Sequence, residues 1–263
     1  MQGAHLIVTD PLFYALAVPG VLALGLSKGG FAGIGQMATL LLAITMPPLE
    51  AAAIMLPIMI VQDMTAMWVY RKDWNGRVLA IMIPGAILGI GLAWLVAARI
   101  SDDAVRVFIG IVTIGFCVYN WRGLARRSAE APQPPKPLPL RGGVFWATVS
   151  GFTSTICQAG GPPYHVQAMQ LRLPKMVYVA TAAFFFGTMN MLKVVPYLAL
   201  GQFSATGFAT SVALLPLAIA ANAFGFWVVR RTPEKLFFQI TLILLCVISL
   251  ALLWQGGAGL LGL

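Results

Sequence analysis

Lys28 is a charged residue inside an apolar stretch that runs from Val18 to Leu42. An ionisable side chain within a membrane-embedded segment is energetically costly, so its presence there indicates a function. It lies within GLSKGGFAGIGQ at 25–36, where the glycines let the backbone bend and let a ligand approach it closely. A cation beside such a turn is suited to binding an anion.

A second glycine-broken stretch, GFTSTICQAGGP at 151–162, carries a helix-start signal. Pro162 and Pro163 follow its last glycines, and proline suits the first turn of a helix because its φ is fixed and its missing N–H is not needed there. The start of a helix carries free N–H groups and an effective charge of about +0.5, so it attracts anions. We expect the same at 33–36, with the two helix starts facing each other near the membrane midplane.

The expected substrate site combines a cation, backbone amides and neutral hydrogen-bond donors. Its residues are Lys28, Gly29, Gly30, Gly33, Gly35, Gln36, Ser154, Thr155, Cys157, Gln158, Gly160 and Gly161. Lys28 aligns with Ser154 and Gln36 with Pro162, so the site is asymmetric, and we expect selectivity to lie in these differences. The alternative is that the glycines only permit close helix packing.

Four polar residues could couple a second ion or relay a proton: Gln62, Asp63, Asn190 and His165. Asp63 could relay a proton, hold a cation or pair with nearby Arg71 or Lys72. His165 could titrate near neutral pH or be a packed, hydrogen-bonded histidine.

Lys193 lies near the expected end of its helix, and we expect its side chain to snorkel outward. The three cysteines, Cys117, Cys157 and Cys246, show neither metal-site nor disulfide spacing. We therefore expect no metal and no cofactor.

The two glycine stretches belong to a tandem duplication. A shift of 126 positions places Gly25 on Gly151, and past a short insertion near Gln202 the shift becomes 132. Other matching pairs are Gly35 with Gly161, Pro48 with Pro174, Pro84 with Pro216 and Arg99 with Arg231. Repeats with broken helices in corresponding positions indicate the binding site of a transporter.

The composition places the elements in a membrane. The chain is 59% hydrophobic and only 10% charged, whereas soluble domains carry about 25% charged residues. Apolar runs at 51–70, 78–98 and 205–229 are long enough, or nearly so, to span a bilayer. The net charge of +9 does not indicate nucleic acid, because the basic residues cluster in short loops.

We predict an all-α polytopic membrane protein made of two repeats, each a glycine-broken re-entrant helical hairpin followed by three transmembrane helices. The first repeat, 1–121, has its hairpin at about 11–46 and helices at about 49–70, 77–98 and 104–121. A basic, proline-rich cytoplasmic linker covers 122–142. The second repeat, 143–263, has its hairpin at about 143–171 and helices at about 175–199, 205–229 and 236–254.

Loop charges favour hairpins over single crossings. With hairpins, the side opposite the main basic cluster holds only Arg99 and Arg106, as the positive-inside rule requires of the non-cytoplasmic side. The basic cluster comprises Arg71, Lys72, Arg77, Arg122, Arg126, Arg127, Lys136, Arg141, Arg172, Lys175, Arg230, Arg231 and Lys235. If each hairpin were instead a single crossing, the basic residues would be divided almost evenly between the two sides of the membrane. Three crossings per repeat invert the second copy and place both termini in the periplasm.

With the glycine turns, the duplication, the basic linker and the helix starts PPLEAAA and LPKMVYVAT, the chain resembles the TauE/SafE sulfite exporter family from about Pro11 to Trp254. The resemblance implies a bacterial inner-membrane carrier for anions such as sulfite, sulfonates or sulfoacetate. The family's G-x-G-G-G turn is matched only in part, since Gln36 follows Gly35, and Gln158 and Ala159 precede Gly160.

The sequence therefore predicts a secondary anion transporter with alternating access, not an enzyme. Its partners would be a small anionic substrate, the lipid bilayer and, for uptake, a coupled proton or sodium ion. A passive anion channel uses the same electrostatics and stays open as an alternative, as do export and uptake. A membrane-embedded enzyme acting on a sulfur compound through Cys157 and His165 is the third reading.

Overall fold

The computed structural model describes residues 7–28, 48–96, 101–127, 136–199 and 203–262, together with 35, 38, 41–42, 45–46 and 201. Within these residues the chain is all-helical and contains no strand. The first half contains α1 (Pro11–Lys28), α3 (Pro48–Val69), α4 (Gly76–Val96) and α5 (Asp102–Arg127). The second half contains α6 (Leu140–Cys157), α7 (Gly161–Ala168), a 3-10 turn (Met169–Leu171), α8 (Lys175–Ala199), α9 (Ala205–Arg231) and α10 (Glu234–Leu261).

Six helices in the described part of the chain are long and apolar enough to cross a membrane: α1, α3 from Glu50 onward, α4, α8, α9 and α10. This protein is therefore a multi-pass membrane protein. Large hydrophobic side chains such as Trp68, Trp94 and Trp254 are exposed on the outer surface of the bundle. Side chains of this kind suit a surface that faces lipid and its interfaces.

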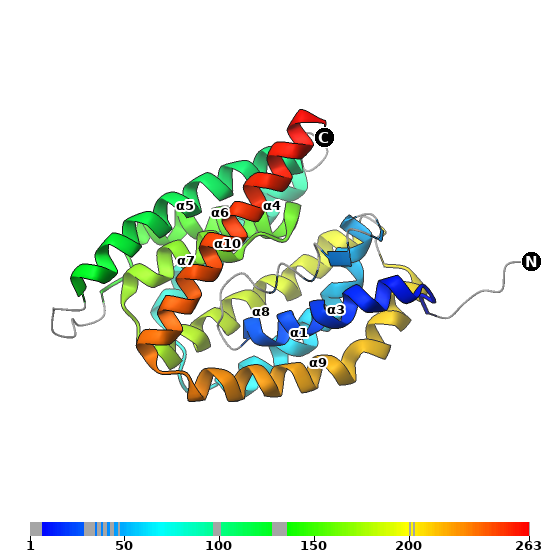
Figure 1. The fold of residues 1–263 in the computed structure, drawn as a ribbon, viewed down its shortest axis with the longest axis horizontal. Coiled ribbons are helices and arrows are strands. Elements are labelled where there is room, and N and C mark those ends of the chain that lie inside the picture. Colours follow the sequence, from blue (N-terminus) through cyan, green and yellow to red (C-terminus); the bar gives the residue numbers. More distant parts are fainter. Residues whose placement is uncertain are drawn as a thin grey trace, which may run out of the picture.

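Two helices run further than the hydrophobic pattern predicts. α5 was expected at about 104–121 and continues to Arg127, while α10 was expected at about 236–254 and continues to Leu261. The two helices pack along each other (Figure 1). At this contact Gly256 lies against the backbone of Asp103, and Gly259 lies against its side chain. The glycines near the end of α10 thus permit close packing there.

The first helix of each half packs against a helix of the other half. α1 lies along α9, and α6 lies along α4 (Figure 1). Glycines make both approaches possible. Gly25 and Gly225 bring the α1 and α9 backbones together, and Gly89 and Gly151 do the same for α4 and α6, leaving no room for a Cβ atom.

The centre of the bundle is formed by α3 and α8, which contact each other. α3 also packs against α9, and α8 also packs against α4. This central pair carries buried polar residues, including Gln62 and Asp63 on α3 and Asn190 and Lys193 on α8. Polar side chains inside a membrane bundle need partners, so this is where a functional site is to be sought.

Candidate functional site

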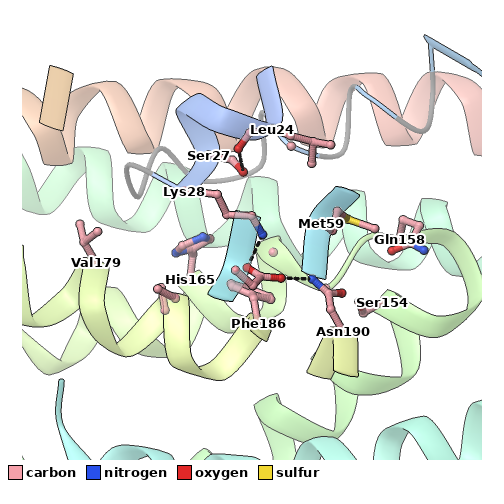
Figure 2. A pocket seen from close by; sticks show the side chains of 16 residues that line it. Leu24, Ser27, Lys28, Met59, Ser154, Gln158, His165, Val179, Phe186 and Asn190 are labelled. Carbon is pink, nitrogen blue, oxygen red and sulfur yellow. Dashed lines mark hydrogen bonds and ion pairs between the residues drawn. The ribbon is translucent and has the colours of Figure 1, made fainter. Parts of the chain in front are cut away.

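A cavity of about 100 Å³ lies where α1 and α6 end, where α7 begins, and where α3 and α8 pass each other (Figure 2). A water molecule occupies about 30 Å³ of bulk liquid, so this volume suits a small oxyanion. The residues lining it are Leu24, Ser27, Lys28, Gly35, Met59, Asp63, Ser154, Gln158, Gly160, Gly161, His165, Val179, Ala182, Ala183, Phe186 and Asn190. Both halves of the chain thus contribute to its wall.

The charged part of the wall is an ion pair between Lys28 and Asp63. Lys28 is the last residue of α1, and its Nζ donates to Oδ1 of Asp63 at 2.5 Å. Nδ2 of Asn190 donates to the other carboxylate oxygen, Oδ2, at 2.6 Å. Asp63 is fully buried, and the dashed lines at Lys28 and Asn190 in Figure 2 mark these two contacts. Asp63 therefore pairs with Lys28 rather than with Arg71 or Lys72, the other partners that the sequence allowed.

The glycine turn of the second half is stabilised by hydroxyls of α6. α6 ends at Cys157, and Gln158 follows in the left-handed conformation with φ 55°. Oγ of Ser150 then donates to the carbonyl of Gly160 at 2.6 Å, and Oγ1 of Thr153 donates to that of Ala159 at 3.0 Å. Both carbonyls of the turn thus accept hydrogen bonds from hydroxyl groups of α6.

The start of α7 borders the cavity through Gly160 and Gly161. Pro162 and Pro163 occupy the next positions and carry no N–H, whereas the N–H of Tyr164 donates to the carbonyl of Gly160 at 3.4 Å. The first turn of a helix leaves its N–H groups without intrahelical acceptors. Because the two prolines carry no N–H, Gly160 and Gly161 supply the backbone N–H groups at the α7 start beside the cavity.

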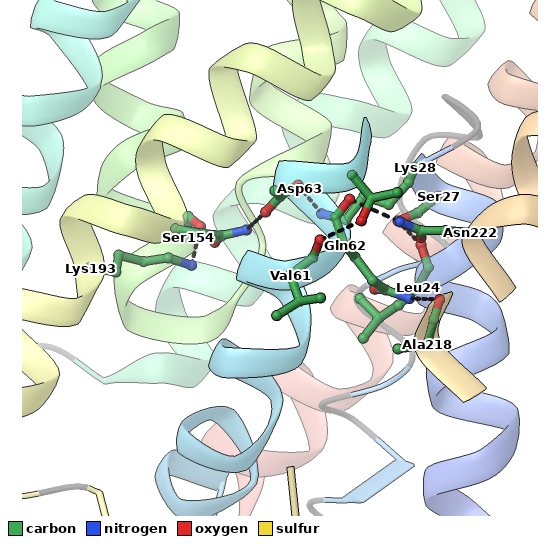
Figure 3. Close-up of polar contacts among 12 residues, drawn as sticks. Leu24, Ser27, Lys28, Val61, Gln62, Asp63, Ser154, Lys193, Ala218 and Asn222 are labelled. Atoms are coloured by element: carbon green, nitrogen blue, oxygen red, sulfur yellow. Dashed lines mark hydrogen bonds and ion pairs between the residues drawn. The ribbon is translucent and has the colours of Figure 1, made fainter. Parts of the chain in front are cut away.

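A second lysine lies behind this wall. Nζ of Lys193 on α8 donates to Oγ of Ser154 at 3.0 Å (Figure 3). It also donates to Oε1 of Gln158 at 2.9 Å. Nε2 of Gln158 in turn donates to the hydroxyl of Tyr197 at 3.1 Å. The expectation that Lys193 snorkels outward is wrong, because its side chain is fully buried. α8 continues to Ala199, and the end of α6 supplies the acceptors.

His165 lines the cavity from α7 and is held by aromatic neighbours. Its Nδ1 lies 2.5 Å from the hydroxyl of Tyr178, and its ring packs against Tyr164 and Phe186. The side chain is 4% exposed. These contacts match the packed, hydrogen-bonded histidine of the sequence analysis, although one edge of the ring reaches the cavity.

Other predicted residues lie elsewhere. Nε2 of Gln62 donates to the carbonyl of Ala218 at 3.1 Å, so Gln62 joins α3 to α9 (Figure 3). The hydroxyl of Thr155 donates within its own helix to the carbonyl of Gly151 at 2.9 Å, and Thr155 does not line the cavity. Gly29, Gly30, Gly33, Gln36 and the side chain of Cys157 lie outside the described residues.

The site is rich in hydrogen-bond donors and poor in negative charge. Among the cavity-lining residues that the structure describes, Asp63 carries the one carboxylate. Lys28 neutralises it, and Lys193 places a second amine behind Ser154 and Gln158. Among the described residues, no group of three or more His, Cys, Asp or Glu side chains is placed to hold a metal ion. The arrangement is suited to binding a small anion.

A membrane bundle with a charged, donor-lined cavity at the meeting point of its two halves has the features of a membrane transporter. The family model for the sulfite exporter TauE/SafE matches residues 17–252. The chain belongs to this family, as the sequence resemblance predicted, and the family comprises transporters rather than enzymes. Neither a curated protein nor a solved structure matches the chain.

Proposed function

We propose that this protein is a secondary transporter of small sulfur-containing anions of the sulfite, sulfonate or sulfoacetate class across the bacterial inner membrane. The observation that carries the proposal is the cavity of about 100 Å³ where Lys28, the α7 start and the neutral donors Ser154 and Gln158 converge. Family membership supports an anionic substrate and a role in export.

The transport mechanism we propose is alternating access between two inverted repeats. The support for this mechanism is that corresponding helices of the two repeats make corresponding contacts across the bundle. α1 pairs with α9 as α6 pairs with α4, and α3 pairs with α9 as α8 pairs with α4. The partners in each comparison are matching helices of the two repeats. Such an arrangement is expected of a two-fold pseudo-axis through the α3–α8 contact, beside the cavity.

The two helical hairpins are proposed to be re-entrant, so that the chain returns to the side from which it entered. α6 has 18 residues and α7 has eight. At 1.5 Å per residue they extend about 27 and 12 Å, and α7 in particular is far shorter than the ~30 Å hydrocarbon core. With three crossings after each hairpin, both termini lie in the periplasm and the 122–142 linker lies in the cytoplasm.

Asp63 is the proposed coupling residue. Its carboxylate holds Lys28, and protonation of Asp63 would release the Lys28 ammonium to the substrate anion. Uptake would then carry a proton, or a sodium ion that neutralises Asp63 in its place. Export of a monoanion needs no coupling, since it gains ~2.3 kcal/mol per 100 mV of inside-negative potential.

The proposal is tested with purified protein in a thermal-shift screen against sulfite, thiosulfate, sulfate, taurine and sulfoacetate. Lys28→Ala is the test variant, and Lys72→Ala is the control because Lys72 is exposed in the α3–α4 loop. We expect the sulfur anions to stabilise the wild type and Lys72→Ala but not Lys28→Ala. No stabilisation of the wild type by any of the five compounds would contradict the proposal.

Flux in proteoliposomes separates a carrier from the passive-channel alternative. We expect anion loaded on the far side to accelerate uptake of labelled anion when the membrane potential is clamped at zero, because a carrier returns faster when loaded. Flux that does not respond to anion on the far side would favour the channel.

A further inference from the structure

Lys193 is a buried lysine without a carboxylate partner in the described part of the chain. The two salt bridges found there join Lys28 to Asp63 and Arg106 to Asp103. Among the described residues, the Nζ of Lys193 contacts the neutral oxygens of Ser154 and Gln158, and its side chain is 0% exposed. Buried charges in proteins are normally paired. Protonated Lys193 would therefore leave one positive charge to be balanced by a ligand.

Lys193 also determines what the cavity wall presents. An ammonium group only donates, so Lys193 occupies an acceptor site on Oγ of Ser154 and on Oε1 of Gln158. The Ser154 hydroxyl keeps its own hydrogen to donate. The Gln158 amide has two N–H groups, and the bond to Tyr197 uses one of them. Both side chains line the cavity, so their remaining hydrogens are available as donors to an anion.

We infer that Lys193 is the counter-charge of the bound anion and the positioning residue that makes Ser154 and Gln158 its donors. The inference rests on the proposed transport function. Lys28 and Asp63 neutralise each other, so the site retains one net positive charge, from Lys193. It therefore selects monoanions, such as a small sulfonate or hydrogen sulfite, over dianions and over neutral molecules of the same shape.

The test measures binding of methanesulfonate and of dimethyl sulfone, its neutral near-isostere, to purified protein by calorimetry. We expect wild-type protein to prefer methanesulfonate by about tenfold or more, the scale of one charge-assisted hydrogen bond. Lys193→Met should remove most of this preference, because it weakens binding of methanesulfonate and leaves the affinity for dimethyl sulfone unchanged. Lys193→Arg should retain the preference, since arginine keeps the charge.

Lys175→Met is the matched control on the same helix. Nζ of Lys175 donates to the carbonyls of Val229 and Thr232 at 2.9 and 2.6 Å, away from the cavity. Its loss should leave both affinities unchanged. A purely structural lysine at 193 would affect stability but not the ratio of the two affinities.

The outcomes separate the two levels of the proposal. Wild-type protein that binds none of the sulfur anions contradicts the transport function itself. Wild-type protein that binds sulfate or sulfite but not methanesulfonate overturns only the inference about monoanions. Equal anion preference in Lys193→Met and wild type also overturns the inference. If Lys193→Met is not recovered folded, Ser154→Ala is the test variant, because it keeps Lys193 and removes one donor to the anion. An unchanged methanesulfonate affinity in Ser154→Ala would then count against the inference.

Discussion

Asn190 on α8 donates to the carboxylate of Asp63 on α3, at 2.6 Å and across 127 positions of the chain. The second oxygen of the same carboxylate accepts from Lys28. One fully buried group therefore joins α1, α3 and α8, and with them the two halves of the protein. A carboxylate held from both sides is fixed in orientation, so changes at any of its partners should affect the cavity.

The Lys28–Asp63 pair should show strong coupling in stability. Lys28→Met and Asp63→Leu each leave one charge buried without its partner, which costs about 3–5 kcal/mol in soluble proteins. The double variant removes both charges, and we expect it to be more stable than either single variant. Unfolding in mixed micelles measures the three free energies of unfolding. A double variant whose loss equals the sum of the single losses would contradict a direct pair.

Small residues at the crossed helix contacts should be needed for folding. A Cβ atom on Gly225 would collide with the backbone of Gly25, and one on Gly89 with that of Thr148. We expect Gly225→Ala and Gly89→Ala to lower the thermal midpoint of the detergent-solubilised protein. Gly91→Ala, also on α4, is the control.

A Cβ atom on Gly91 meets no atom. Alanine there should be neutral or stabilising by up to about 1 kcal/mol, since it favours the helix more than glycine does. Equal losses at positions 89, 91 and 225 would show that helix packing is not the cause.

The hydroxyl of Ser150 should support the anion site without touching it. It donates to the carbonyl of Gly160 in the turn beside the cavity. Ser150→Ala removes this hydrogen bond, which costs about 0.5–1.5 kcal/mol, because the carbonyl still accepts from the N–H of Tyr164. We expect weaker sulfite binding as well, measured by calorimetry, because the start of α7 loses a support.

Ser249→Ala is the control for Ser150. Ser249 is also buried, but its hydroxyl donates within α10 to the carbonyl of Leu245. We expect sulfite affinity to be unchanged in this variant. If Ser150→Ala and Ser249→Ala bind sulfite equally well, the turn does not depend on the Ser150 hydroxyl.

The proposed topology places the α3–α4 loop in the cytoplasm and the α4–α5 loop in the periplasm. Asp73 and Ser101 are exposed in these two loops. In a background without native cysteines, we expect an impermeant thiol reagent to label Ser101→Cys in intact cells and Asp73→Cys only after permeabilisation. The reverse pattern would invert the orientation, and labelling of both in intact cells would contradict a crossing by α4.

The residues of the cavity were largely predictable from the sequence, because a polar group in an apolar helix is conspicuous. Lys28, Asp63 and Asn190 were found in this way, and the proline signal located the start of α7. The sequence did not reveal which groups meet. Asp63 has basic residues close by in sequence, at 71 and 72. In the structure α3 is oriented so that the Asp63 side chain contacts Lys28 and not these two residues.

Lys193 shows the limit of reasoning from position along a helix. Its distance from the expected helix end suggested snorkelling, but burial depends on which neighbouring helices cover the residue. Lys193 is covered by the end of α6, where it contacts Ser154 and Gln158, which lie 39 and 35 positions earlier in the sequence. The available signal was the number of ionisable residues in the apolar segments, because Lys28 and Lys193 are two lysines for the single aspartate Asp63.

The crossed packing of α1 on α9 and of α6 on α4 has a consequence for biosynthesis. When the ribosome has made the first half, α1 can contact α3 but lacks α9, its main partner, and α4 lacks α6, the helix that will cover it. The first half must remain inserted but incomplete until α6 and α9 are synthesised. Co-expressed fragments 1–127 and 136–263 should therefore assemble with each other, whereas either fragment alone should be degraded.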